Sequence, residues 1–143
     1  MHPKTATARK TLLRAQAELD EANKLAKKDA KRDFERVRQA AEKGWRAARE
    51  AVYAVIAAYD KDPGRRTMST NAVRKFEEEF LGRPTTELQP LSAGYQNAIS
   101  ELHGRTFYEG LTTTEVDVNL AQVHVLIEQA SRDLNEGPRG RKK

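Results

Sequence analysis

Apolar residues recur at alternating spacings of four and three along several stretches of the chain, which is the pattern of one helical face. In the N-terminal stretch the pattern is carried by Ala8, Leu12, Ala15, Leu19, Ala22 and Ala26, and nothing there breaks a helix. The charged, weakly patterned run that follows (KKDAKRD, 27–33) predicts a tight turn. One continuous helix through this run is the alternative.

The next stretch carries a wide apolar stripe and predicts the second long helix. The stripe consists of Phe34, Val37, Ala41, Trp45, Ala48, Val52, Val55, Ile56 and Tyr59. Gly44 lowers helix propensity by roughly 1 kcal/mol relative to alanine, and its missing side chain suits a close helix crossing. The sequence Asp62-Pro63-Gly64 then predicts a turn that ends the helix.

Two shorter helices are predicted next. Ser69 or Thr70 can cap the third helix. Its apolar side holds Val73, Phe76 and Phe80, and Gly82 and Pro84 end it. Pro90 fits the first turn of the fourth helix, and Gly104 ends or bends that helix. The apolar stripe of the fourth helix is Leu91, Tyr95, Ala98, Ile99 and Leu102.

A fifth helix opens at Thr112 and Glu115, which have capping-box spacing. Its stripe is Val116, Leu120, Val123, Ile127, Ala130 and Leu134. No segment alternates with a period of two, so no sheet is expected. The sequence predicts an all-α antiparallel bundle of about five helices with two long N-terminal helices. We expect a single domain over residues 1–137 and a basic, disordered tail at 138–143.

Composition limits both the chemistry that this bundle can perform and its location in the cell. The chain has 143 residues and no cysteine, which excludes disulfides, thiolate nucleophiles and cysteine-based zinc sites. No pair of histidines has metal-ligand spacing on a helix, so neither a metal nor a cofactor is expected. No stretch is long and apolar enough for a membrane span, and the N-terminus lacks a signal-peptide core. We therefore expect a cytoplasmic protein.

The net charge of +5 is concentrated in the tail, which contains Arg139, Arg141, Lys142 and Lys143. These four residues leave 22 of the 26 basic residues for the rest of the chain, against 21 acids, so the body has a net charge of only +1. The tail is a candidate for weak, non-specific contact with RNA or DNA backbones. A solvated terminus without a binding role is the simpler interpretation.

Two segments resemble a known family. The segment 41–59 (AEKGWRAAREAVYAVIAAY) is similar to the second helix of the archaeal PaREP-type family, and 102–110 (LHGRTFYEG) is similar to its Leu-His…Phe-Tyr-Glu signature, with one additional residue between His103 and Phe107. The resemblance covers roughly residues 10–135. It implies a helical bundle like those of the HEPN superfamily (higher eukaryote and prokaryote nucleotide-binding domains), and a homodimer.

Many HEPN proteins are ribonucleases whose signature is an arginine and a histidine separated by four to six intervening residues, and that pair is missing here. Before His103 the required positions hold Ala98, Asn97 and Gln96. Before His124 they hold Asn119, Val118 and Asp117. Cleavage by that route needs a general base beside a cation that stabilises the phosphorane charge. The sequence therefore favours a protein that is not an enzyme.

Two groups of residues remain as ligand-binding candidates. The first comprises His103, Arg105, Tyr108 and Glu109, which could line a small anionic-ligand site or simply fasten the ends of two helices. The second comprises Trp45, Arg46 and Arg49, which could stack a base and hold its phosphate. Since Trp45 belongs to the apolar stripe, a core role is the simpler interpretation, with the two arginines paired to Glu42 and Glu50. His124 is expected to be buried or half-buried in helix packing.

Together these observations predict a non-enzymatic, HEPN-like helical interaction module that binds a partner protein or a nucleotide or RNA ligand. One alternative is an RNA-binding protein or an atypical ribonuclease of toxin–antitoxin type that uses the His103 region. Another is a scaffold subunit of a larger complex.

Overall fold

The computed structural model describes residues 3–27, 34–58, 69–81, 91–105 and 113–136, and every one of these residues except Ser69 is helical. The helices are α1 (Pro3–Lys27), α2 (Phe34–Ala58), α3 (Thr70–Phe76) continued by η3 (Glu77–Leu81), α4 (Leu91–Asn97) continued by η4 (Ala98–Arg105), and α6 (Thr113–Glu136). The segments η3 and η4 are π-helical. The all-α prediction is therefore confirmed for the described residues.

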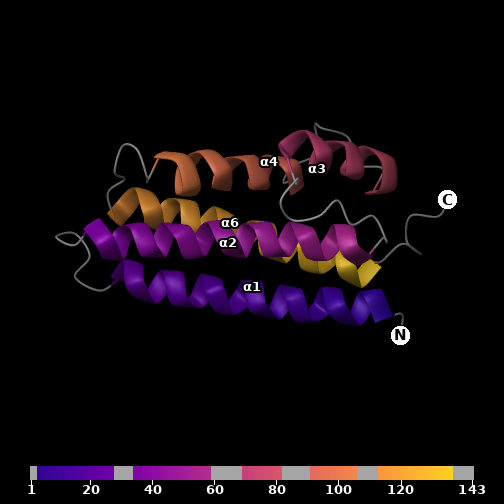
Figure 1. The fold of residues 1–143 in the computed structure, drawn as a ribbon, viewed down its shortest axis with the longest axis horizontal. Coiled ribbons are helices and arrows are strands. Elements are labelled where there is room, and N and C mark those ends of the chain that lie inside the picture. The colour runs from indigo at the N-terminus through magenta and orange to yellow at the C-terminus, as the bar shows by residue number, and fades with distance from the viewer. Residues whose placement is uncertain (1–2, 28–33, 59–68, 82–90, 106–112, 137–143) are drawn as a thin grey trace.

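The three long helices lie lengthwise beside one another, and α3 and α4 lie along the side of α2 that faces away from α1 (Figure 1). In chain direction, α1 and α4–η4 run opposite to α2 and α6 (Figure 1). Because α1 ends at Lys27 and α2 starts at Phe34 and returns along it, the two are separate helices. The alternative of one continuous helix is wrong. Several predicted boundaries lie outside the described residues. They are the turn at Asp62-Pro63-Gly64, the helix-end signals Gly82 and Pro84, and the helix-start signals Pro90 and Thr112.

The central helix is α2, which α1, α4–η4 and α6 all contact. Its buried side chains include members of the predicted stripe, but also alanines outside that stripe, namely Ala40, Ala47, Ala51 and Ala54. Alanine has almost no side-chain volume, so neighbouring helices approach closely on several sides of α2. The apolar periodicity predicted one buried face, and the surrounding helices bury most of the others.

Gly44 lies where α2 meets η4 and α6. A Cβ atom at this position would overlap Cδ2 of Leu120 and would lie 3.1 Å from Cδ1 of Leu102. The side chains of α6 and η4 thus occupy the space that any larger residue at position 44 would need. The close helix crossing predicted at this glycine is confirmed.

The other predicted stripes agree with the observed burial. All six stripe residues of α6 are buried, as are Ala15 and Leu19 in α1 and Leu91, Tyr95, Ala98 and Leu102 in α4–η4. Gly104 was predicted to end or bend the fourth helix, and η4 ends at Arg105, one residue after it. The helix changes from α to π geometry at Ala98. None of the described helices is long and apolar enough to cross a membrane.

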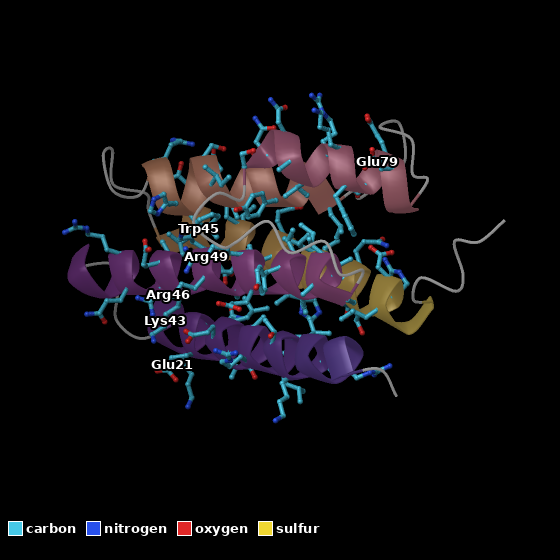
Figure 2. The ribbon with its side chains drawn as sticks, turned by 45° about the vertical axis from the view of Figure 1, so that its right-hand side comes forward. Glu21, Lys43, Trp45, Arg46, Arg49 and Glu79 are labelled. Carbon is cyan, nitrogen blue, oxygen red and sulfur yellow. The ribbon has the colours of Figure 1, made fainter. Side chains whose placement is uncertain are left out.

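Two side chains cap the short helices. Ser69 is the N-cap of α3, since its hydroxyl accepts a hydrogen bond of 3.1 Å from the backbone N–H of Ala72. The N-terminus of α4 is capped from a distant part of the sequence. The Glu77 carboxylate accepts hydrogen bonds from the backbone N–H of Leu91 and, at 3.0 Å, from that of Ser92. Glu77 is only 2 % exposed, whereas Glu78 and Glu79 are exposed, as Figure 2 shows for Glu79.

We expect Gly44→Ala to destabilise the fold by about 1 kcal/mol. The overlap with Leu120 and Leu102 costs about 1–3 kcal/mol, which exceeds the gain of roughly 1 kcal/mol in helix propensity. The measurement is urea unfolding followed by circular dichroism. Ala17→Gly at an exposed position of α1 reports the propensity term alone. Stabilisation of the Gly44→Ala variant would show that the three helices separate there without cost.

We expect Glu77→Gln to lower the free energy of unfolding by about 1–3 kcal/mol. Glutamine has the same size, but its amide nitrogen would face one of the two backbone N–H groups that the carboxylate now satisfies. Thermal unfolding measures the loss. Glu79→Gln, two residues further on and exposed, is the matched control and should stay within about 0.5 kcal/mol of the unsubstituted protein. Equal effects of the two substitutions would contradict the capping role.

Candidate functional site

The structure brings the two candidate groups together across the contact between α2 and η4. The His103 imidazole, near the end of η4, lies against the Trp45 indole with 5.2 Å between ring centroids and an interplanar angle of 32°. The Nδ1 atom of His103 lies 3.5 Å from Oε1 of Glu42, one turn before Trp45 on α2. The His103 side chain remains 46 % exposed. A histidine, a tryptophan and a carboxylate therefore form one cluster at the edge of the core.

Trp45 is buried, with a relative exposure of 9 %. Besides His103, its ring is contacted by Tyr95, with centroids 5.6 Å apart, and the Arg49 guanidinium lies 5.7 Å from the ring centroid. The core interpretation of Trp45 is confirmed by its burial. With 9 % of the residue exposed, little of the ring is accessible for stacking a nucleotide base.

Burial also acts on the neighbouring Tyr95, which is 1 % exposed. Loss of solvation raises the pKa of the Tyr95 phenol above its ordinary value, and the positive charge of Arg49 opposes part of that rise. Since burial dominates, Tyr95 stays a neutral phenol at physiological pH. It can act as a hydrogen-bonding group beside Trp45, but it does not supply an anion to the cluster.

Arg105 is held by two carboxylates. Its guanidinium lies 2.7 Å from Glu101 on η4 and 3.9 Å from Glu115 on α6. These contacts offset the charge that an anionic ligand would need, and they tie η4 to the start of α6. The other residues of this group, Tyr108 and Glu109, lie outside the described residues. The first candidate group is therefore represented here by His103 and Arg105 alone.

Arg46 and Arg49 lie on the part of α2 that remains accessible, Arg46 exposed and Arg49 partly buried. Figure 2 shows both side chains extending from α2 beside Trp45 and Lys43. The expected ion pairs with Glu42 and Glu50 are not formed, since Glu42 instead faces His103 and Glu50 is buried. Within the described part of the chain, neither guanidinium is paired with a carboxylate. The Nε atom of Arg49 is buried and has no hydrogen-bond partner.

The prediction that His124 is buried or half-buried is wrong. His124 is exposed, and its Nε2 atom lies 3.0 Å from Oε2 of Glu128 on the next turn of α6. The reason is helical geometry: successive residues are rotated by about 100°, so a neighbour of the buried Val123 can point away from the core. No group of three His, Cys, Asp or Glu residues suited to a metal ion occurs within the described ranges.

Two features of the site were not found from the sequence. The Glu42–His103 contact joins residues far apart in the chain, and only the apolar stripes that bring α2 and η4 together hinted at it. The cap formed by Glu77 belongs to the acidic run at 77–79, in which the sequence does not distinguish the buried Glu77 from the exposed Glu78 and Glu79. The tail residues Arg139, Arg141, Lys142 and Lys143 lie outside the described residues.

Comparisons with known proteins add no assignment: no family model, curated protein or solved structure matches this chain. The resemblance to the PaREP-type family and the HEPN superfamily therefore stays a prediction. The site has to be interpreted from its own geometry.

We expect His103→Gln to raise the fluorescence of Trp45, the single tryptophan of the chain, because the substitution removes the imidazole that lies in ring contact with the indole and quenches it. His124→Gln, at an exposed position of α6, is the control and should leave the fluorescence unchanged. Emission spectra recorded at one pH measure both variants. Equal spectra of the two variants would contradict the ring contact.

Proposed function

We propose that this chain is a non-enzymatic, HEPN-like helical interaction module that binds a phosphate-bearing ligand, a nucleotide or single-stranded RNA, through the arginines of α2. The observation that supports it is the difference between two sets of cations. His103 and Arg105 face carboxylates of the same chain, whereas Arg46 and Arg49 form no ion pair with a described residue and are reachable from solvent. An accessible cation without a carboxylate partner gains more binding free energy from a phosphate than a cation that is already paired.

Most accessible residues of α2 form one strip along the helix, and Lys43 lies beside it, paired with Glu18 of α1. The strip consists of Arg38, Gln39, Glu42, Arg46, Arg49 and Tyr53, all exposed or partly buried. Arg46 and Arg49 are one turn apart, about 4.5 Å along the helix axis, so both can contact one phosphate or two adjacent ones. Tyr53 follows one turn after Arg49, and its side chain packs partly against the core while remaining partly accessible. Alternation of arginine and aromatic groups suits nucleotide ligands, which carry phosphates and flat bases.

Trp45 contributes by holding Arg49 in place. A guanidinium over an indole ring is attracted by the ring's electron density and loses rotamer freedom before any ligand arrives. Part of the side-chain conformational entropy of Arg49 is therefore lost on folding, so less entropy is lost when a ligand binds. The basic residues of the tail add sequence-independent phosphate contacts to this proposal.

The same contacts speak against a ribonuclease that uses His103. Its Nδ1 atom faces Glu42 and one side of its ring lies on Trp45. Arg105, the cation two residues further along the chain, is engaged by Glu101 and Glu115. Arg105 is therefore not available to stabilise the charge of a phosphorane at His103. Binding without cleavage is the function that the described geometry supports best.

We expect the double substitution Arg46→Glu/Arg49→Glu to abolish most binding to a fluorescein-labelled single-stranded RNA. In the unsubstituted protein, log K should fall linearly with log salt concentration, and loss of two phosphate contacts should reduce the slope by about 1.4, at roughly 0.7 per contact on a single strand. Fluorescence anisotropy at several salt concentrations measures both quantities, and gel analysis of the same RNA reports cleavage.

The matched control is Arg74→Glu/Lys75→Glu, which reverses two exposed charges on α3 and makes the same change in net charge. Its slope should stay near that of the unsubstituted protein. Truncation after residue 137 separates the tail from α2. An equal loss in both double variants would contradict a site on α2, and binding that survives both but not the truncation would place it in the tail. Absence of any RNA or nucleotide binding would favour a protein partner or a scaffold role.

A further inference from the structure

The first half of α1 presents a basic face with an exposed leucine in its middle. Leu13 is 69 % exposed, more than any other large hydrophobic residue in the described part of the chain. Arg9 and Lys10 lie one turn before it, on either side, and Arg14 follows it. All three cations are exposed, as is Ala17 one turn after Leu13. These five residues are called the basic face of α1 below.

Packing within the bundle does not account for this leucine. The helix α1 contacts α2 and α6 and buries Thr11, Ala15 and Leu19. Leu13 lies two residues after Thr11, so it is rotated from it by about 200° and points away from the bundle. A single exposed leucine is common on protein surfaces and indicates nothing by itself. The three cations around it are the second observation, because none of them forms an ion pair with a described residue.

The positive charge is confined to the first half of this helix. Further along the outer side of α1, Asp20 and Glu21 are exposed, and Figure 2 shows Glu21 extending outward from the helix. The exposed Lys24 offsets only one of these two negative charges. The second half of the outer side therefore has no net positive charge, and only the basic face attracts anions.

The same end of the bundle gains further positive charge from α6. The helix α1 begins where α6 ends (Figure 1), and Arg132 is exposed near that end. The nearby acids of α6 are engaged or buried, since Glu128 lies 3.0 Å from His124 and Asp133 is 1 % exposed. The four cations of the tail follow α6 in the sequence. Positive charge therefore gathers at the end of the bundle that carries the basic face.

From this combination we infer that the basic face of α1 binds the surface of a membrane that contains anionic lipids. In this arrangement Leu13 enters the boundary between the headgroups and the acyl chains, and the three cations around it contact lipid phosphates. The long side chains of arginine and lysine can reach the headgroups while the leucine between them lies deeper. A nucleic acid would also bind the cations, but it offers no apolar layer for Leu13. The exposed leucine is what favours a lipid surface.

The contact is expected to be weak and reversible. A lysine or arginine near an anionic surface strengthens binding about fivefold, and one leucine adds far less apolar area than a lipid anchor. The headgroups repel Asp20 and Glu21, so only the first half of α1 approaches them. The inference does not depend on the proposed ligand site, because Arg46 and Arg49 lie on α2.

Co-sedimentation of the full chain with vesicles tests the inference. The protein should bind vesicles of phosphatidylcholine mixed with phosphatidylserine, should dissociate from them as salt is raised, and should not bind phosphatidylcholine alone. Arg9→Gln/Arg14→Gln should weaken binding about 25-fold, at about fivefold for each cation. Arg74→Gln/Lys75→Gln, which removes two exposed charges on α3, is the control and should retain binding.

The leucine is tested separately from the charges. Leu13→Gln removes the apolar group without a change in charge and should weaken vesicle binding about tenfold, at roughly fourfold per buried CH2 group. Val118→Gln, at the other exposed large hydrophobic position, is its control and should have no effect. All substituted positions are exposed, so the fold should be unaffected, which circular dichroism checks.

Absence of binding to the mixed vesicles would overturn the inference. Equal binding by the unsubstituted protein and both α1 variants would overturn it as well, and loss only on truncation after residue 137 would place the contact in the tail. Loss in Arg9→Gln/Arg14→Gln but not in Leu13→Gln would contradict insertion into the lipid. If the arginine variant lost binding to RNA but kept binding to vesicles, the basic face would be a nucleic-acid site. Arg46→Glu/Arg49→Glu should retain vesicle binding, which keeps this inference and the proposed ligand site apart.

Discussion

The packing of α2 against three neighbours determines most of this structure. A helix that is contacted by α1, α4–η4 and α6 has little room for side chains. Alanine at many positions and glycine at 44 satisfy that requirement, and Leu120 and Leu102 occupy the space that Gly44 leaves. Close packing of this kind is sensitive to volume changes of a single methyl group. It also explains why a chain with only 6 % aromatic residues can form a continuous core.

This crowding is also what leaves α2 a single accessible strip, and so concentrates its charged side chains there. Glu42, Arg46 and Arg49 share that strip because the remaining faces of the helix are covered. Because Glu42 faces His103, Arg46 and Arg49 have no carboxylate partner among the described residues. The ligand site we propose thus arises from the packing, since no motif in the sequence specifies it.

The π-helical geometry of η4 determines how the site is assembled. Up to Asn97 the fourth helix is α-helical, and from Ala98 it is wider, with more residues per turn. The π-helical geometry changes the direction in which later side chains point, and in this frame Leu102 faces Gly44 while the ring of His103 lies on Trp45. Such segments occur frequently at functional sites in helical proteins.

Local sequence patterns were sufficient to predict the all-α class and the buried stripe of α6. They favoured two separate N-terminal helices while leaving one continuous helix open, and they limited the cap of α3 to Ser69 or Thr70. These features depend on residues a few positions apart, whose relation is fixed by helical periodicity. The burial of α2 on nearly all sides, the cap that Glu77 places on α4 and the Glu42–His103 contact were decided only by the tertiary structure. Each of them joins different helices, and periodicity within one helix contains no information about which side chain of another helix will face it. For the same reason the two candidate groups were treated as separate although they form one cluster. The exposure of His124 was mispredicted for a different reason, because a residue next to the buried Val123 is rotated by about 100° around the same helix.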